Sequence, residues 1–288
     1  MLGAVALLIR ILSNPFSNLF QKKLGGYGAN SLFISFFSYF ILTVLCLIPA
    51  FNVNWAGFGL EFWQIVLSAG IIGALGNWFL VEAIKCGELS VLGPINTYKS
   101  VVSVIFAFIL LHEIPSLFQF AGIFFIVVGS YFIFDTVEQK FTFALFKRRD
   151  IRFRFFALAL TALEAVLIKK IVLLCGISTA FILWCSFSAL FSFLILLIKR
   201  QNLKYEFSLV NPKSLKLYLA LATTLFLMQF FTNIVFEKMN VSCALALFQL
   251  SSLISVFLGW RYFKEKEIKK KVLGTLIMIF GSCVIILT

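Results

Sequence analysis

The sequence contains very little of what most catalytic sites need. His112 is the single histidine, and only 12 of the 288 residues are Asp or Glu. Acids this sparse do not favour a carboxylate metal centre, and His112 has no cysteine nearby that could act as its nucleophile. The sequence therefore predicts no metal site, no cofactor and no enzyme active site.

Cysteine pairs with metal-ligand spacing are also missing. The six cysteines are scattered, with no CxxC and no histidine partner, at Cys46, Cys86, Cys175, Cys185, Cys243 and Cys283. This pattern favours small apolar side chains over a metal or disulfide framework. The opening MLGAVALLIRILSNPF has no basic region before its apolar run and carries Arg10 inside it. We expect this segment to be a first membrane span rather than a cleaved signal.

Apolar segments of membrane length make up most of the chain. Hydrophobic residues account for 61% of the sequence, whereas soluble proteins contain about half. About 20 apolar residues cross a bilayer as a helix. Ten segments meet this length, at 2–20, 30–50, 60–84, 90–111, 116–135, 153–174, 178–198, 214–236, 242–263 and 268–287. The sequence predicts an all-α integral membrane protein, with no room for a soluble catalytic domain.

The basic residues are sorted by loop. Lys and Arg number 25 against 12 acidic residues, an excess that could indicate nucleic-acid binding. However, most of them lie in or beside the loops after the first, third, fifth, seventh and ninth spans. The exceptions are Arg10, Lys99, Lys169, Lys170 and Lys238. This bias predicts orientation, with the basic loops in the cytoplasm, both termini outside and no nucleic-acid partner.

The second half of the chain repeats the first at an offset of 152 residues, without gaps. The repeated residues are Ser90, Ser100, Ser103, Val104, Glu113, Gly122, Gly129 and Ser130, matched by Ser242, Ser252, Ser255, Val256, Glu265, Gly274, Gly281 and Ser282. A unit with five spans must place its second copy upside down, and such repeats enclose a substrate path at their interface. We expect domains at 1–135 and 153–288, a basic linker at 136–152, and a central cavity.

One motif resembles a known family. His112-Glu113 and the following Gln119, Gly122 and Gly129 resemble the G-E-x-x-x-x-x-Q-x-x-G…G signature of EamA repeats in the drug/metabolite transporter superfamily. His112 stands in place of the usual glycine, and the second copy lacks the glutamine. The resemblance implies a secondary transporter with ten helices in two inverted repeats. It also implies a bacterial inner membrane with both termini in the cytoplasm, opposite to the prediction from charge.

The signature glutamates Glu113 and Glu265 fall between two predicted spans. A carboxylate there can cap the N-terminus of the following span, where it faces the positive end of the helix dipole. Contact with substrate is the alternative. We expect capping.

Polar residues within the first predicted span form one helical face. Arg10, Asn14, Ser17 and Gln21 recur at helical spacing around Pro15. Proline removes a backbone donor and can expose a carbonyl to a ligand. This face either lines a cavity or packs against polar neighbours, and we expect it to line a cavity.

The fourth predicted span carries a lysine at mid-depth. Lys99 shares a face with Gly93, Asn96, Ser100 and Ser103 and lies too deep to reach the membrane surface comfortably. It either contacts an anionic group of the substrate or forms an internal ion pair. The nucleotide-sugar and sugar-phosphate branches of the superfamily place a lysine at a similar position. They usually add one in the ninth span, where this chain has Ser251.

Side-chain amides and one further acid complete the set of candidate binding residues. Asn77 aligns with Gln229, and Thr97 with Gln249, so both halves present amides at matching depths. Glu164 lies at mid-depth in the sixth predicted span. It is predicted either to carry a coupling proton or to pair with Arg10.

The sequence predicts a secondary active transporter that moves a small charged or zwitterionic metabolite, amino-acid-like or nucleoside-like, by alternating access. A multidrug exporter of the same fold is the alternative, and a membrane enzyme or scaffold is less favoured. Expected partners are the bilayer, a small-molecule substrate and a coupling proton or exchanged metabolite, with the chain acting as a monomer or homodimer. The primary binding candidates are Arg10, Asn14, Asn77, Asn96, Lys99, Glu164, Gln229 and Gln249. The secondary candidates are Ser17, Trp78, Glu82, Tyr98, Trp184 and Asn233.

Overall fold

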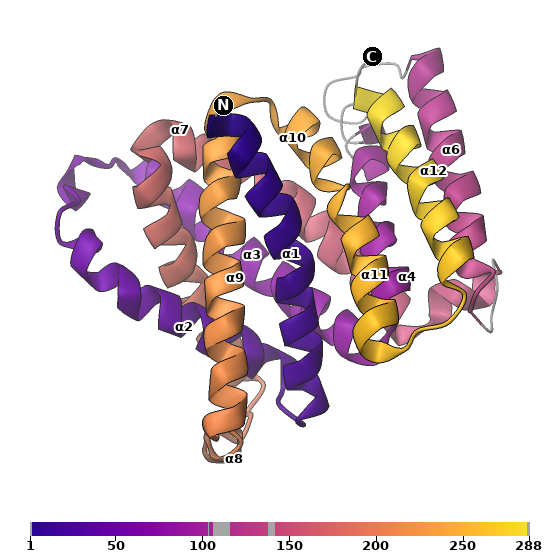
Figure 1. Cartoon of the computed structure of the whole chain (residues 1–288). Coiled ribbons are helices and arrows are strands. Elements are labelled where there is room, and N and C mark those ends of the chain that lie inside the picture. Colours follow the sequence, from indigo (N-terminus) through magenta and orange to yellow (C-terminus); the bar gives the residue numbers. More distant parts are fainter. Residues whose placement is uncertain (1, 103, 106–115, 138–141, 287–288) are drawn as a thin grey trace.

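The chain folds into a bundle of helices (Figure 1). The structure is a computed structural model and describes residues 2–102, 104–105, 116–137 and 142–286. The first half contains α1 (Leu2–Gly26), α2 (Ser31–Ala50), α3 (Leu60–Cys86), α4 (Leu89–Ile95) and α6 (Leu117–Phe134). The second contains α7 (Arg149–Ile198), α8 (Leu203–Ser208), α9 (Pro212–Lys238), α10 (Val241–Phe248), α11 (Ser251–Phe263) and α12 (Ile268–Ile286).

Seven helices within the described residues are long and apolar enough to cross a membrane. One of them is two spans. At 50 residues, α7 would extend for about 75 Å as a single helix, against about 30 Å of hydrocarbon. Gly176, with φ 78° and ψ 170°, breaks the helix at the centre of this element. The sixth and seventh predicted spans are therefore the two arms of α7.

The fourth and ninth spans are both interrupted, at matching positions. A 3-10 turn over Asn96–Tyr98 follows α4, and a turn at Gln249 and Leu250 separates α10 from α11. The repeat offset aligns Thr97 with Gln249 and Tyr98 with Leu250. Paired interruptions in corresponding spans are typical of helices that line a transport site.

The two halves have opposite orientations. In Figure 1, α1 begins at the top beside the N-terminus and runs downward, whereas its counterpart, the first arm of α7, begins near the bottom. The described ends of the chain lie at the same side of the bundle. The predicted all-α fold with two inverted repeats is confirmed.

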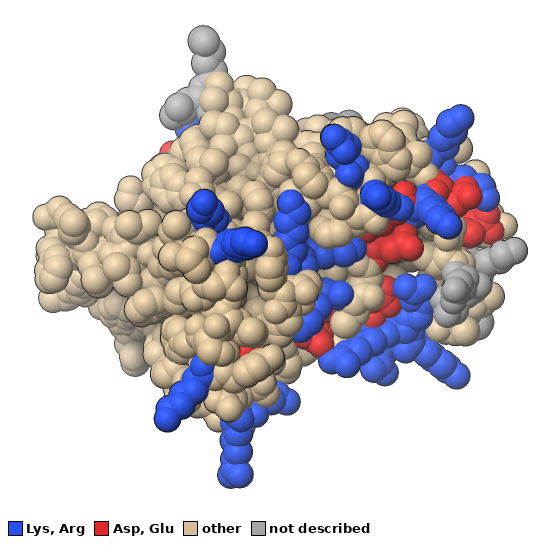
Figure 2. All heavy atoms as spheres, turned by 60° about the horizontal axis from the view of Figure 1, so that its bottom comes forward, with Lys and Arg blue, Asp and Glu red and all other residues tan. Residues whose placement is uncertain are grey.

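Basic residues collect on the side opposite the termini, which we call the basic face. It carries the turns after α1, α3, α6 and α11, together with α8, and Figure 2 shows Lys and Arg side chains gathered over it. Acidic residues are interspersed. On this face Lys22 pairs with Glu265 at 2.9 Å, and Lys271 pairs with Glu88. The sorting predicted from the sequence therefore corresponds to one surface.

Two hydrophobic cores hold the bundle together, and each draws on both halves of the chain. One joins α1, α2 and α3 with α7 and α9, and the other joins α4 and α6 with the start of α7, α11 and α12. The most extensive helix pairings, α3 with α7, α6 with α12 and α1 with α9, all cross between halves. The repeats are therefore interlocked rather than placed side by side.

The pairing of α6 with α12 explains the repeated glycines. A Cβ at Gly129 would lie 2.6 Å from the Gly274 carbonyl oxygen, and one at Gly122 would lie 2.6 Å from that of Gly281. Each glycine of the repeat therefore faces a glycine of the other copy. Small residues allow this close approach of helix backbones in a membrane.

Glu265 caps a different helix from the one predicted. Its carboxylate accepts hydrogen bonds from the backbone N–H groups of Leu89 and Ser90, both at 2.8 Å. These groups begin α4 in the other half, where the N-cap Glu88 provides no side-chain bond of its own. The expectation that Glu265 caps the following span, α12, is wrong, because the fold brings the turn before α12 against the start of α4. Its counterpart Glu113 and the neighbouring His112 lie outside the described residues.

Candidate functional site

A polar cavity of about 120 Å³ lies at the centre of the bundle, between the two halves. Helices α1, α2, α3, α7, α9 and α10 all reach it, together with the 3-10 turn that follows α4. Its wall includes seven of the eight primary candidates, Arg10, Asn14, Asn77, Asn96, Lys99, Glu164 and Gln229, and the secondary candidate Trp184. The interrupted fourth and ninth spans both contribute, through Asn96, Lys99 and Phe248.

Three cations line this cavity. Arg10 extends from α1, and its guanidinium lies 4.0 Å from the centre of the Phe248 ring. Its Nε and Nη1 are buried without a hydrogen-bond partner. Lys99 is 9% exposed, and none of the hydrogen bonds or ion pairs found among the described residues includes its ammonium. Both side chains therefore keep donors available to a ligand.

The third cation, Arg154, was not among the predicted site residues. It lies one turn into α7, is 6% exposed and lines the cavity. Its Nε donates to the Leu92 carbonyl at 2.8 Å. That carbonyl is available because the Asn96 N–H turns to Gly93 and Pro94 at the 3-10 interruption instead of completing the helical bond. The break in the fourth span thus anchors Arg154.

Glu164 is the acid that faces these cations. The Trp184 indole N–H donates to its Oε1 at 3.0 Å, and the carboxylate interacts electrostatically with Lys99. A Cβ at Gly73 would lie 2.9 Å from the Glu164 carboxyl carbon, so the glycine on α3 provides the space that this side chain occupies. Of the two predicted alternatives, no Arg10–Glu164 ion pair is found among the described residues.

Side-chain amides connect the cavity wall to the helices behind it. The Asn77 amide donates to the Ser35 hydroxyl at 2.8 Å. The Gln229 amide donates to the side-chain carbonyl oxygen of Asn233 at 3.0 Å. Asn96 donates to the carbonyl oxygen of Gln249 at 3.1 Å. Gln249, the remaining primary candidate, therefore lies behind Asn96 and orients it.

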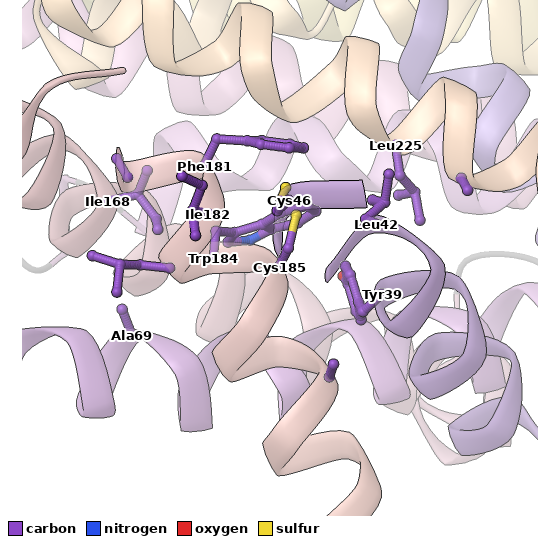
Figure 3. Close-up of a cluster of buried hydrophobic side chains, with 14 of the residues drawn as sticks. Tyr39, Leu42, Cys46, Ala69, Ile168, Phe181, Ile182, Trp184, Cys185 and Leu225 are labelled. Carbon is purple, nitrogen blue, oxygen red and sulfur yellow. The ribbon is translucent and has the colours of Figure 1, made fainter. Parts of the chain in front are cut away.

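Aromatic rings form the apolar part of the wall. Tyr39 and Trp184 meet edge to face, with ring centroids 4.9 Å apart. Figure 3 shows Trp184 beside the sulfur atoms of Cys46 and Cys185, among buried side chains of α2, α3, α7 and α9. The six cysteines are free thiols. This packing fixes the indole that binds Glu164.

Five secondary candidates lie away from the cavity. Trp78 packs on Phe79 and lies 5.4 Å from the Lys199 ammonium, while Glu82 pairs with Arg149 at the basic face. The remaining three, Ser17, Tyr98 and Asn233, bond to Ser13, Ser130 and Gln229 respectively. Ser103 lies outside the described residues.

Other lining residues, including Asn18, Tyr39, Thr161 and Thr232, were not among the predicted site residues. Thr161 and Asn18 each fall one helical turn from a predicted residue, Glu164 and Asn14. This one-turn spacing is the sequence signal that could have identified Thr161 and Asn18.

Comparison with known proteins gives a family match and a structural match. The sequence matches the EamA-like transporter family twice, at residues 1–135 and 152–287. Curated proteins give no significant match. The alignment with one crystal structure covers 98% of this chain and 95% of the chain in that structure, at 14% sequence identity and a TM-score of 0.69. At that identity the structural match shows the fold alone.

Proposed function

Because the chain belongs to the EamA-like transporter family, whose members are transporters rather than enzymes, we propose that this multi-pass membrane protein moves a small charged or zwitterionic organic metabolite by alternating access. The proposed location is a bacterial inner membrane. The proposed repeat domains are residues 1–135 and 153–288, joined by the basic linker 136–152.

One observation carries this proposal. A cavity between the inverted halves holds ionisable side chains from several helices, at the depth where two spans are interrupted. Ionised groups inside a membrane are costly unless they pair with another group or line a water-filled pathway. Sites at the interface of inverted repeats can be opened to each side in turn when one group of helices rocks against the other.

The proposed roles follow from the chemistry of each side chain. Arg10, Lys99 and Arg154 bind anionic groups of the substrate, and the amides of Asn14, Asn77 and Gln229 bind its neutral polar groups. Tyr39, Trp184 and Phe248 contact its apolar surface. A lipophilic cation is disfavoured because it would be repelled by three basic side chains.

The test is uptake by the purified protein in proteoliposomes. Radiolabelled amino acids, nucleosides and organic anions are offered to the wild type and to Arg10→Ala and Lys99→Ala. We expect uptake of one class by the wild type and loss of at least about 90% in each variant, because each change removes a charged contact worth about 1.5–3 kcal/mol. Uptake that is unchanged in both variants at equal protein incorporation would remove the cavity from the pathway.

Glu164 is proposed to carry a coupling proton. In that role Glu164→Gln abolishes accumulation driven by a proton gradient and leaves substrate exchange intact, because exchange needs no net proton movement. Gradient-driven uptake and counterflow exchange are measured on the same proteoliposomes. Accumulation that persists with the same pH dependence would contradict the coupling role.

A further inference from the structure

The central cavity contains more positive than negative charge. Arg10, Lys99 and Arg154 line it together, and Glu164 is the one acid of its lining within the described residues. These groups act on one another, since Arg154, Arg10 and Glu164 all interact electrostatically with Lys99. With each group in its usual ionised form, two positive charges have no counterpart in the wall.

Outside the cavity, Lys271 is the one fully buried cation of the described residues, and it is paired. Lys271 is 1% exposed, and its ammonium binds the Glu88 carboxylate and the Ser90 hydroxyl. Lys22, which is partly exposed, binds Glu265. In both contacts a protein acid matches the positive charge. The cavity departs from this pattern.

The unmatched donors point to a ligand. Two buried nitrogens of Arg10 have no partner, and the Phe248 ring covers the face of its guanidinium. A covered face leaves the N–H edges of the group available, and these match two oxygens of a carboxylate or phosphate. The backbone bond that Arg154 makes to Leu92 uses one of its five N–H groups.

We propose that the substrate carried by this cavity is a small organic dianion, with its charge on two carboxylates or on one phosphate. The inference rests on the proposed transport function and narrows its substrate class. A dianion balances the excess charge of the wall, whereas a zwitterion leaves it unchanged and a cation increases it. The volume of about 120 Å³ suits a ligand whose body has a few carbon atoms.

The test uses a charge series on one four-carbon skeleton. Binding of succinate, butyrate, 4-aminobutyrate and 1,4-diaminobutane to the purified protein is measured by titration calorimetry. Glycerol 3-phosphate is added to distinguish phosphate from dicarboxylate. We expect at least one of the two dianions to bind at least about tenfold tighter than the monoanion, the zwitterion or the dication.

Variants then locate the charges. Lys99→Gln and Arg154→Gln should each weaken dianion binding by about 10- to 100-fold, whereas Glu164→Gln should strengthen it, because removal of the one acid increases the positive charge. Lys213→Gln is the matched control, since Lys213 is exposed on the basic face and does not line the cavity. Its dissociation constant should equal that of the wild type.

The proposal is overturned if the zwitterion or the monoanion binds as tightly as the better dianion. It is also overturned if neither dianion binds at millimolar concentration, or if Glu164→Gln weakens dianion binding. Uptake into proteoliposomes keeps the two proposals separate. Transport of 4-aminobutyrate alone would retain the transporter and reject the dianion, whereas dianion binding with the expected variant pattern but no uptake would retain the site and reject transport.

Discussion

The Glu265 carboxylate has three donors: the Lys22 ammonium at 2.9 Å and the backbone N–H groups of Leu89 and Ser90 at 2.8 Å. Burial alone would raise its pKa, but Lys22 and Ser90 outweigh burial and hold the pKa below its ordinary value of 4.5. A carboxyl whose pKa is lower in the folded state stabilises the fold above the unfolded-state pKa. This contribution is lost as the pH falls through the folded-state pKa.

Glu265→Gln should therefore destabilise the protein by about 2 kcal/mol at pH 7. The difference from wild type should disappear as the pH falls through the lowered folded-state pKa of Glu265, because the wild-type carboxyl is then protonated as well. Thermal unfolding of both proteins in detergent across this pH range measures the difference in stability. Glu237→Gln, at an exposed position, is the control, and a deficit that is constant with pH would exclude the ionised carboxylate as the cause.

Single residues also show how far the site could be predicted. Arg10, Lys99 and Glu164 were identified because ionisable side chains interrupt apolar runs. Arg154 was missed because it stands at the start of a predicted span, beside Lys147, Arg148 and Arg149, where charge usually marks a loop. Its role depends on the freed Leu92 carbonyl, and that is a property of the fold.

At the scale of helices, the contact between α6 and α12 depends on having no side chain at four positions. Gly129 faces Gly274, and Gly122 faces Gly281. Gly129→Leu should force these helices apart and destabilise the protein by at least about 1–3 kcal/mol, as overpacking does. Val127→Leu, where Val127 is 40% exposed, is the control. Equal thermal midpoints for the two variants in detergent would show that the close approach is not needed.

The interrupted spans mark the limit of prediction for elements. Pro94 indicates a break in the fourth span, but the equivalent position in the ninth is Ala246. No proline therefore indicates the turn at Gln249 in the sequence. The seven long apolar helices of the described residues, one of them the two arms of α7, lie where apolar length predicts spans, because lipid imposes that length. The interruption of the ninth span could not be read from the sequence, because it depends on packing at the cavity.

At the scale of the whole molecule, the basic face predicts the orientation in the membrane. Positive loops are retained in the cytoplasm, so the turn between α9 and α10 should lie outside and α8 inside. In a cysteine-free background, Asn240→Cys should react with an impermeant maleimide added to intact cells, and Ser208→Cys should react only after lysis. Both positions are exposed. The reverse labelling would place the termini in the cytoplasm.

The interlocking of the two halves has a consequence for biosynthesis. The surfaces that α1, α3 and α6 bury in the finished protein are provided by α9, α7 and α12, which the ribosome makes later. Until then Arg10 and Lys99 lack the part of the cavity wall that the second half provides, which is unfavourable for charged side chains in a membrane. We therefore expect a chain truncated between the two halves to leave these surfaces uncovered and not to act as a half-sized transporter. Both halves must be synthesised before the buried surfaces and the cavity wall are complete.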